Sequence, residues 1–295
     1  MGYARMSERV ELFEVGPRDG LQNEATPISA QDKIALVDLL STAGFRRIEV
    51  ASFVSPKWVP QMATSADVLA GITRSEGISY AALTPNMRGL EGAITARADE
   101  VAIFGSASEG FSKANINASI EESLERFHPI AKTAIERGIP VRGYISCVIN
   151  CPYDGPTDPT AVGSVARELH QMGCYELSLG DTTGHAYPEE ITKMLCAVKD
   201  VVPDAVLAGH YHDTSGRALA NVEASLQEGV RVFDTSIGGL GGCPYAPGAL
   251  GNVATEAVAV RLLELGYETG LNRDVLAQAA RFATSATSLR GEAKV

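Results

Sequence analysis

The strongest constraint on the fold is an alternation of short β-branched runs with helix-length amphipathic stretches, which occurs eight times along the chain. The first unit predicts a strand over Val10 to Gly16, followed by a helix that Ser29 caps and Gly44 ends. Strands that alternate with helices form a parallel sheet. The other seven predicted strands, in chain order, are RIEVASF, ISYAALT, EVAIFGSA, VRGYISCV, YELSLGDT, AVLAGHYHD and VFDTSIGG.

Eight such units in 295 residues favour closure of the sheet into a TIM (β/α)8 barrel. We predict a single α/β domain over residues 1–295, with a short additional C-terminal helix in RDVLAQAARFAT. A doubly wound open sheet is the alternative, but its usual G-x-G-x-x-G is absent from EVGPRDG after the first strand. Active sites of such barrels lie at the carboxyl ends of the strands, so the polar residues there are the functional candidates.

Charge and cysteine content narrow the classes of partner and compartment. A net charge of -11 argues against nucleic acid and anionic membrane surfaces, and no apolar run is long enough to cross a bilayer. The strand pattern begins almost at the first residue, which leaves no room for a signal peptide. The five cysteines, an odd number, then predict reduced thiols in a cytoplasmic protein.

The segment HYHD, at the end of the seventh predicted strand, indicates a metal site. His210 and His212 are two residues apart, so both side chains point to the same face of the strand. Closure of the barrel brings the first strand near the seventh, which makes Asp19 a further ligand candidate. Asn252, at the end of the glycine-rich segment GGLGGCPYAPGALGN, adds an amide oxygen. This set suits Mg²⁺ or Mn²⁺, with Zn²⁺ or Co²⁺ as alternatives; a pair of core histidines is the non-functional interpretation.

Other polar residues at strand ends have two interpretations each. Arg18 offers a planar set of donors to a developing enolate oxygen, or forms an ordinary ion pair. Glu49 lies in an otherwise apolar strand, where it is functional or holds Arg18. Asp181 is a base, a supporting group or a helix N-cap. Cys243 is an incidental loop residue or a thiol carried on a glycine-hinged lid.

At this point the sequence resembles the 3-hydroxy-3-methylglutaryl-CoA (HMG-CoA) lyases of the DRE-TIM metallolyase superfamily. The resemblance rests on seven motifs that occur in order between about residue 10 and residue 260. They are EVGPRDGLQNE, IEVASFVSPKWVPQM, SASEGFSKANIN, RGYISCVINCPYDG, LSLGDTTG, GHYHDTSGRALAN and GGLGGCPYAPGALGNVATE. One such motif is suggestive, whereas seven in the same order are highly specific.

The resemblance implies a metal-dependent carbon–carbon lyase that cleaves HMG-CoA to acetyl-CoA and acetoacetate, a reaction of leucine catabolism. It implies one divalent cation, Mg²⁺ or Mn²⁺, held by Asp19, His210, His212 and Asn252. It also implies an acyl-CoA substrate, and we expect a homodimer or higher homo-oligomer.

The same resemblance implies roles for further residues. Arg18 would stabilise the enolate of the departing thioester, and Cys243 would deliver or relay the proton to carbon. Asp181 and His210 would be the candidates for the proton of the tertiary hydroxyl. The substrate-binding residues would be Arg18, Gln22, Glu49 and Ser52.

Three alternatives to this function remain open on the sequence. One is a lyase for a longer branched 3-hydroxyglutaryl-CoA, another a related acyl-CoA condensing synthase, and the third a catalytically silent acyl-CoA-binding protein. The synthases commonly carry a long C-terminal region that this chain lacks. The chain also departs from many members of the family at Ala25, where they carry lysine, so a charge role at that position is not expected.

Overall fold

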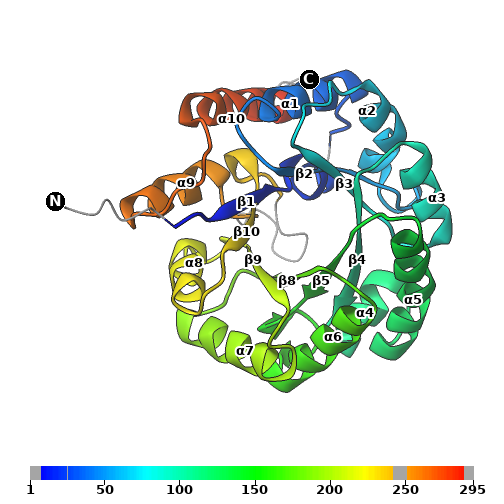
Figure 1. Ribbon diagram of the computed structural model, residues 1–295, viewed down its shortest axis with the longest axis vertical. Coiled ribbons are helices and arrows are strands. Elements are labelled where there is room, and N and C mark those ends of the chain that lie inside the picture. Colours follow the sequence, from blue (N-terminus) through cyan, green and yellow to red (C-terminus); the bar gives the residue numbers. More distant parts are fainter. Residues whose placement is uncertain (1–7, 25, 242–250, 289–295) are drawn as a thin grey trace, which may run out of the picture.

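The computed structural model of the protein describes residues 8–24, 26–241 and 251–288. Among these residues, eight parallel strands close into a barrel in the order β1-β10-β9-β8-β5-β4-β3-β2 (Figure 1). The strands are β1 (Glu11–Glu14), β2 (Arg47–Ser52), β3 (Ser79–Leu83), β4 (Glu100–Ser106), β5 (Val141–Ser146), β8 (Glu176–Asp181), β9 (Val206–Tyr211) and β10 (Val232–Thr235). The closed barrel confirms the predicted fold and excludes the open doubly wound sheet.

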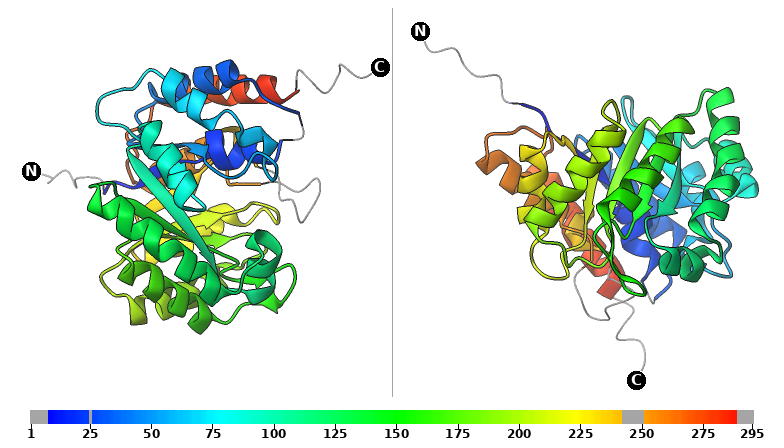
Figure 2. Two further views of the ribbon diagram at one scale, coloured as in Figure 1. Left: turned by 90° about the vertical axis from the view of Figure 1, so that its right-hand side faces the viewer. Right: turned by 90° about the horizontal axis from the view of Figure 1, so that it is seen from below.

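The helices surround the barrel, as the three directions of view in Figures 1 and 2 show. They are α1 (Ala30–Leu40), α2 (Ser65–Gly71), α3 (Met87–Thr95), α4 (Glu109–Ile116), α5 (Ile120–Glu136), α6 (Pro159–Gln171), α7 (Pro188–Val201), α8 (Ala218–Gln227), α9 (Thr255–Glu264) and α10 (Arg273–Ser288). The additional C-terminal helix is thus confirmed as α10. It lies beside α1, where the Asn272 N–H donates to the Ala43 carbonyl at 2.8 Å just before α10 begins.

The predicted start of the first helix after Ser29 is confirmed, whereas the helix ends at Leu40, before the predicted stop at Gly44, which lies in the turn that follows. The Ser29 hydroxyl accepts a hydrogen bond from the Asp32 N–H at 3.1 Å, which satisfies one of the free donors of the first turn. Gly44 has a φ of 98°, and a Cβ there would lie 2.6 Å from the Gly270 carbonyl oxygen. Only glycine fits this end of the α1 region without strain.

Two short structures at the carboxyl ends of the strands are absent from the eight-unit pattern. Helix α4 follows β4 within SASEGFSKANIN, and the hydroxyl of its N-cap Ser108 accepts the Phe111 N–H at 3.2 Å. After β5, the short strands β6 (Asn150–Cys151) and β7 (Gly155–Pro156) form an antiparallel pair. Both are insertions between a strand and its covering helix, so they leave the barrel topology intact.

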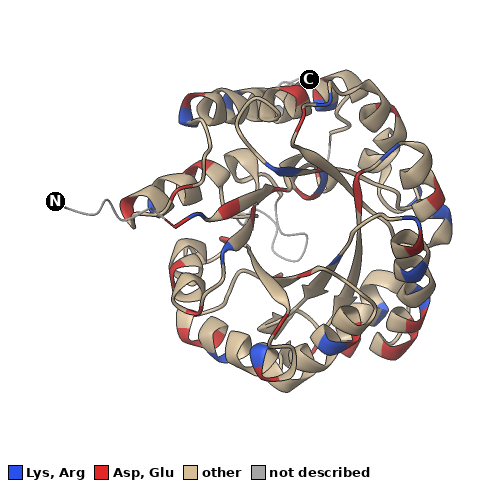
Figure 3. Ribbon diagram, in the orientation of Figure 1, with Lys and Arg blue, Asp and Glu red and all other residues tan. Residues whose placement is uncertain are grey.

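The apolar core lies between the barrel and the helices, while much of the barrel interior is charged. Figure 3 shows basic and acidic positions on the barrel strands as well as on the outer helices. Arg142 on β5 is 1% exposed and binds Asp234 of β10 and Glu176 of β8, and Glu176 in turn binds Arg47 of β2. This buried ion-pair chain, Asp234–Arg142–Glu176–Arg47, replaces the branched aliphatic layers usual in such barrels. No helix in the described ranges is long and apolar enough to cross a membrane.

Candidate active site

A tight turn after β1 places Arg18 and Asp19 at the carboxyl end of the barrel. Gly16–Gly20 form one π-helical turn, η1, in which the N–H groups of Arg18, Asp19 and Gly20 all point at the Val15 carbonyl. Such turns occur preferentially at functional sites because they widen the backbone and redirect neighbouring side chains. Here the turn directs the side chains of Arg18 and Asp19 toward the carboxyl end of β9.

Three of the predicted metal ligands meet at this place. One ligand atom each from Asp19, His210 and His212 lies within 4.8 Å of the others. His210 is the penultimate residue of β9, and His212 lies two residues further along the chain, so both imidazoles stand on the same side of the strand. Their ring centroids are 5.5 Å apart. The predicted proximity of the first and seventh predicted strands is therefore confirmed.

Asn252 reaches the same site through the backbone. It forms an antiparallel bridge with His212, and the Val253 N–H donates to the Tyr211 carbonyl at 3.0 Å. The Asn252 Nδ2 donates to Asp19 Oδ2 at 2.8 Å and to the Leu240 carbonyl at 3.3 Å. A Cβ at Gly241, whose φ is 106°, would lie 2.7 Å from that Nδ2. Glycine at 241 therefore leaves the space in which Asn252 approaches Asp19.

The donor set fits a divalent cation. Asn252 Oδ1 and His212 Nδ1 are buried and find no hydrogen-bond partner among the described residues. Buried polar atoms are normally paired, so these two atoms beside a carboxylate suit a cation as a partner. Amide oxygen, carboxylate oxygen and imidazole nitrogen are ligands that Mg²⁺ and Mn²⁺ accept.

Local charges set the protonation of these ligands. Burial raises the pKa of Asp19, but Arg18 and the two histidines more than offset this, and the resulting pKa is about 2. Burial and the neighbouring His210 lower the pKa of His212 to about 4. Burial lowers the pKa of His210, while its hydrogen bond to Asp234 raises it, and the net change is upward. Asp19 is thus ionised and His212 neutral near pH 7, as metal binding requires.

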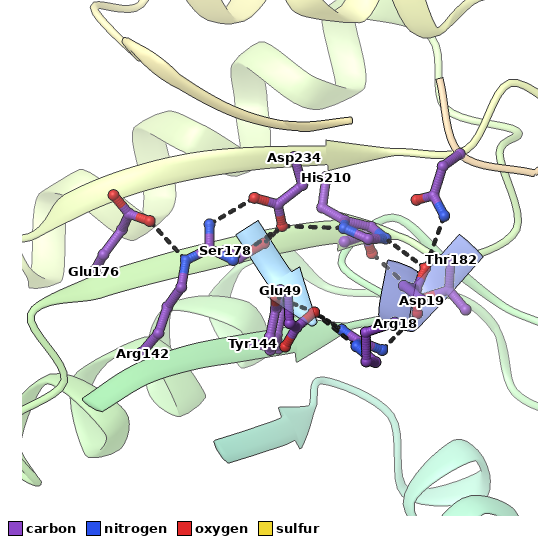
Figure 4. Close-up of polar contacts among 12 residues, drawn as sticks. Arg18, Asp19, Glu49, Arg142, Tyr144, Glu176, Ser178, Thr182, His210 and Asp234 are labelled. Carbon is purple, nitrogen blue, oxygen red and sulfur yellow. Dashed lines mark hydrogen bonds and ion pairs between the residues drawn. The ribbon is translucent and has the colours of Figure 1, made fainter. Parts of the chain in front are cut away.

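Arg18 is held beside the candidate metal ligands by two carboxylates (Figure 4). Its Nε lies 2.6 Å from Glu49 Oε2, and its Nη1 lies 2.6 Å from Asp19 Oδ1. The Tyr144 hydroxyl donates to the same Glu49 oxygen at 3.0 Å, and the guanidinium carbon lies 5.4 Å from the Tyr144 ring centroid. Of the two interpretations of Glu49, these contacts agree with the one in which Glu49 holds Arg18. Burial lowers the pKa of Arg18, but the charges of Glu49 and Asp19 raise it by more, so the net pKa is raised and the guanidinium stays charged.

Comparison with known proteins identifies the family. The family model described as HMGL-like matches residues 9–283. The chain is 57% identical over 276 residues to a 3-hydroxy-3-isohexenylglutaryl-CoA/hydroxy-methylglutaryl-CoA lyase of Pseudomonas aeruginosa, which covers 94% of this chain and 92% of the relative. The chain belongs to the HMGL-like family. It resembles the HMG-CoA lyase structure from Brucella melitensis with a TM-score of 0.94 and 56% identity, over 97% of this chain and 100% of that one.

A more distant HMGL-like relative was solved with ligands. The HMG-CoA lyase from Acinetobacter baumannii, in complex with coenzyme A and 3-methylmalate, is 36% identical to this chain with a TM-score of 0.90. The match covers 97% of this chain and 93% of that chain. Coenzyme A is thus bound in a relative that has the same fold as this chain.

Two of the predicted substrate-binding residues of this HMGL-like protein have defined surroundings. The Gln22 Nε2 donates to Asp19 Oδ1 at 3.1 Å, so Gln22 contacts a candidate metal ligand. The Ser52 hydroxyl, at the end of β2, is buried without a hydrogen-bond partner among the described residues. Contact of either residue with substrate stays a prediction.

Asp181 is engaged by the turn that follows β8. Its Oδ1 accepts the Gly184 N–H at 3.1 Å, and its Oδ2 accepts the Ala186 N–H at 2.9 Å. In the sheet it pairs with Tyr211, whose hydroxyl contacts Ser225 of the outer helix α8. These contacts are those of a turn-supporting carboxylate rather than of a helix N-cap. A role as base stays a prediction. Burial raises the pKa of Asp181 even though the backbone donors lower it.

Cys243 and Ala25 lie outside the described residues. The described part of the glycine-rich segment ends at Gly241 and resumes at Gly251. The residues that the sequence analysis missed are Arg142, Tyr144, Ser178 and Asp234, which all lie on the barrel strands. Their signal was present, because charged or polar residues at alternate positions of a buried strand mark an interior face that is not apolar.

Proposed function

We propose that this protein is a divalent-metal-dependent lyase that cleaves HMG-CoA to acetyl-CoA and acetoacetate. The observation that carries the proposal is the convergence of Asp19, His210 and His212 beside a buried Arg18, in a chain 57% identical to a lyase named for this substrate. The A. baumannii complex supports the acyl-CoA part of the proposal, since coenzyme A is bound in that relative.

The reaction breaks the bond between C2 and C3 of the substrate. The 3-hydroxyl loses its proton as C3 becomes the ketone of acetoacetate, and the electron pair of the broken bond forms the enolate of acetyl-CoA. That enolate must be protonated on carbon before it adds back to the ketone. A divalent cation bound by Asp19, His210, His212 and Asn252 would supply Lewis-acid polarisation of the hydroxyl oxygen.

Arg18 would stabilise the charge that develops on the thioester oxygen. Its guanidinium is already fixed by Glu49 and Asp19, so little reorganisation is needed when the enolate forms. Cys243 would then donate the proton to carbon, because a thiol is acidic enough to do so near neutral pH.

Asp181 and His210 are the two proposed candidates for the acceptor of the hydroxyl proton. His210 Nδ1 is bonded to Asp234 and its Nε2 faces Asp19, while both Asp181 oxygens accept backbone N–H groups of the turn after β8. The pH dependence of kcat for Asp181→Asn tests this role. Loss of the acidic limb of the profile, with the fold retained, would identify Asp181 as the base. A loss of stability with an unchanged profile would identify it as support for the turn alone.

The decisive assay measures acetoacetate release from purified thioesters. We expect turnover of HMG-CoA with Mg²⁺ or Mn²⁺, none under excess chelator, and recovery when the metal is returned. The 3-hydroxy-3-isohexenylglutaryl thioester serves as the second substrate, because the P. aeruginosa relative is named for both. A higher kcat/KM for that thioester would mean that the enzyme prefers the longer branched substrates. Full turnover by metal-stripped protein would exclude a requirement for the metal ion.

The assembly and location of the protein are further parts of this proposal. We infer a homodimer or higher homo-oligomer, and we infer a cytoplasmic location because the odd number of cysteines predicts reduced thiols. Sedimentation equilibrium measures the first, and fractionation of the source cells measures the second.

A further inference from the structure

Asp234 contacts His210 at the inner edge of the metal site. It lies on β10, is 1% exposed, and accepts a hydrogen bond from His210 Nδ1 to its Oδ2 at 3.1 Å. His210 and Asp234 are register partners on adjacent strands, so the contact follows from the sheet itself. The other ring nitrogen, Nε2, lies 3.9 Å from Asp19 Oδ2. The ring is therefore held between a fixed carboxylate and the metal-ligand cluster (Figure 4).

The Asp234 carboxylate cannot easily rotate, because donors hold both of its oxygens. Arg142 binds it in bidentate fashion, with Nη2 at 2.7 Å from Oδ1 and Nη1 at 3.0 Å from Oδ2. The Ser178 hydroxyl donates to Oδ2 at 2.7 Å. Glu176 in turn fixes Arg142, whose Nε donates to its Oε1 at 2.6 Å. The buried ion-pair chain of the barrel interior thus ends on the imidazole of a metal ligand.

A carboxylate offers only acceptors, so the hydrogen in this contact belongs to His210 Nδ1. We propose that Asp234 is a positioning residue that fixes the Nδ1–H tautomer and the ring orientation of His210, so that its Nε2 lone pair faces the cation. This inference rests on the proposed function in that it requires the metal. It assigns Asp234 a task beyond neutralising Arg142, because a carboxylate behind a ligating histidine orients that ligand and strengthens its binding.

The opposing interpretation is that Asp234 only neutralises Arg142 inside the barrel. The two interpretations differ in what Asp234→Asn changes. The carboxamide has the shape of the carboxylate, but its NH₂ group donates where the carboxylate accepts. With that NH₂ toward His210, the proton moves to Nε2, and the tautomer is then wrong for binding a cation.

The experiment measures Mn²⁺ affinity by electron paramagnetic resonance of free Mn²⁺, with thermal unfolding alongside. We expect Asp234→Asn to raise the Kd for Mn²⁺ by roughly 10- to 100-fold, as loss of an orienting partner does. The matched control is Glu176→Gln, which removes the other carboxylate of Arg142 without touching His210. It should lower the unfolding temperature comparably and leave the Mn²⁺ affinity unchanged within error.

Equal affinity in wild type and Asp234→Asn, or equal weakening in Asp234→Asn and Glu176→Gln, would overturn the inference. Absence of Mn²⁺ binding in the wild type would instead overturn the metal part of the proposed function, and the inference with it. Nitrogen-15 NMR of the histidine rings in the Mg²⁺-loaded wild type reports which ring nitrogen of His210 carries the proton. This measurement does not depend on whether any variant folds. The inference requires the proton on His210 Nδ1, and a proton on Nε2 would contradict it.

Discussion

Glu14 provides a test of the electrostatics that join the first and last strands. It ends β1, is 0% exposed, and its Oε1 accepts the N–H groups of Gly16 at 2.8 Å and Ile237 at 2.9 Å. Its Oε2 accepts the Thr255 hydroxyl at 2.6 Å. This one carboxylate thus joins η1, the segment after β10 and the start of α9.

Burial raises the pKa of Glu14 strongly, its three hydrogen bonds lower it, and nearby Glu256 raises it; the net pKa is about 7 against an ordinary value of 4.5. The native state therefore binds more protons than the unfolded chain between these two values. In that window the free energy of unfolding falls as pH rises, and the full contribution of Glu14 is present only below pH 4.5. Integration from about pH 5 to about pH 8 gives a loss of about 2.5 kcal/mol.

Glu14→Gln removes this titration and keeps the contacts. The Gln oxygen can accept both N–H groups, while its NH₂ donates to the Thr255 hydroxyl oxygen. That hydroxyl can then donate to Thr235 Oγ1, which is 2.9 Å away. We expect the free energy of unfolding of the variant, relative to that of wild type, to rise by about 2.5 kcal/mol as the pH is raised from about 5 to about 8.

The assay is urea unfolding followed by circular dichroism at several pH values, with refolding checked at each. Thr255→Ser keeps the donating hydroxyl and should retain the wild-type pH dependence, which makes it the matched control. If the difference between Glu14→Gln and wild type is the same at pH 5 and pH 8, Glu14 is ionised throughout and the reasoning is refuted.

Three further predictions follow from the site and the core. Arg18→Gln should cost about 3–5 kcal/mol of transition-state stabilisation, measured as the loss in kcat/KM. It should also lower the free energy of unfolding, because Glu49 loses its buried partner. Adding Glu49→Gln should restore stability but not turnover, and recovery of both would assign Arg18 a structural role only. Cys243→Ser should keep metal content and unfolding temperature while kcat falls by roughly 100-fold or more; full activity would make the thiol incidental. Phe127→Ala should lower the free energy of unfolding, measured in urea, by about 3–5 kcal/mol. Phe127 is 2% exposed, and its ring packs tilted against that of Phe104 with centroids 4.9 Å apart. A loss under about 1 kcal/mol would mean that the site repacks.

The sequence by itself determined the barrel and most of the candidate metal site. Eight alternations of strand and helix require a parallel sheet, and the two-residue spacing of His210 and His212 requires one common face. Barrel closure then brings the end of the first strand, which Asp19 follows, near these histidines. These conclusions depend only on local periodicity and on the order of strands, which a sequence contains.

Only the tertiary structure decided where the polar side chains of the interior and the strand ends make their contacts. Arg142 on β5 reaches Asp234 on β10 past the two intervening strands, and that distance depends on the curvature and stagger of the whole barrel. Likewise, the engagement of Asp181 by its own turn depends on backbone angles after β8 that its sequence allows but does not require. Side-chain partners across a closed sheet are long-range contacts, so no local pattern specifies them, and the orientation of His210 by Asp234 is one of these.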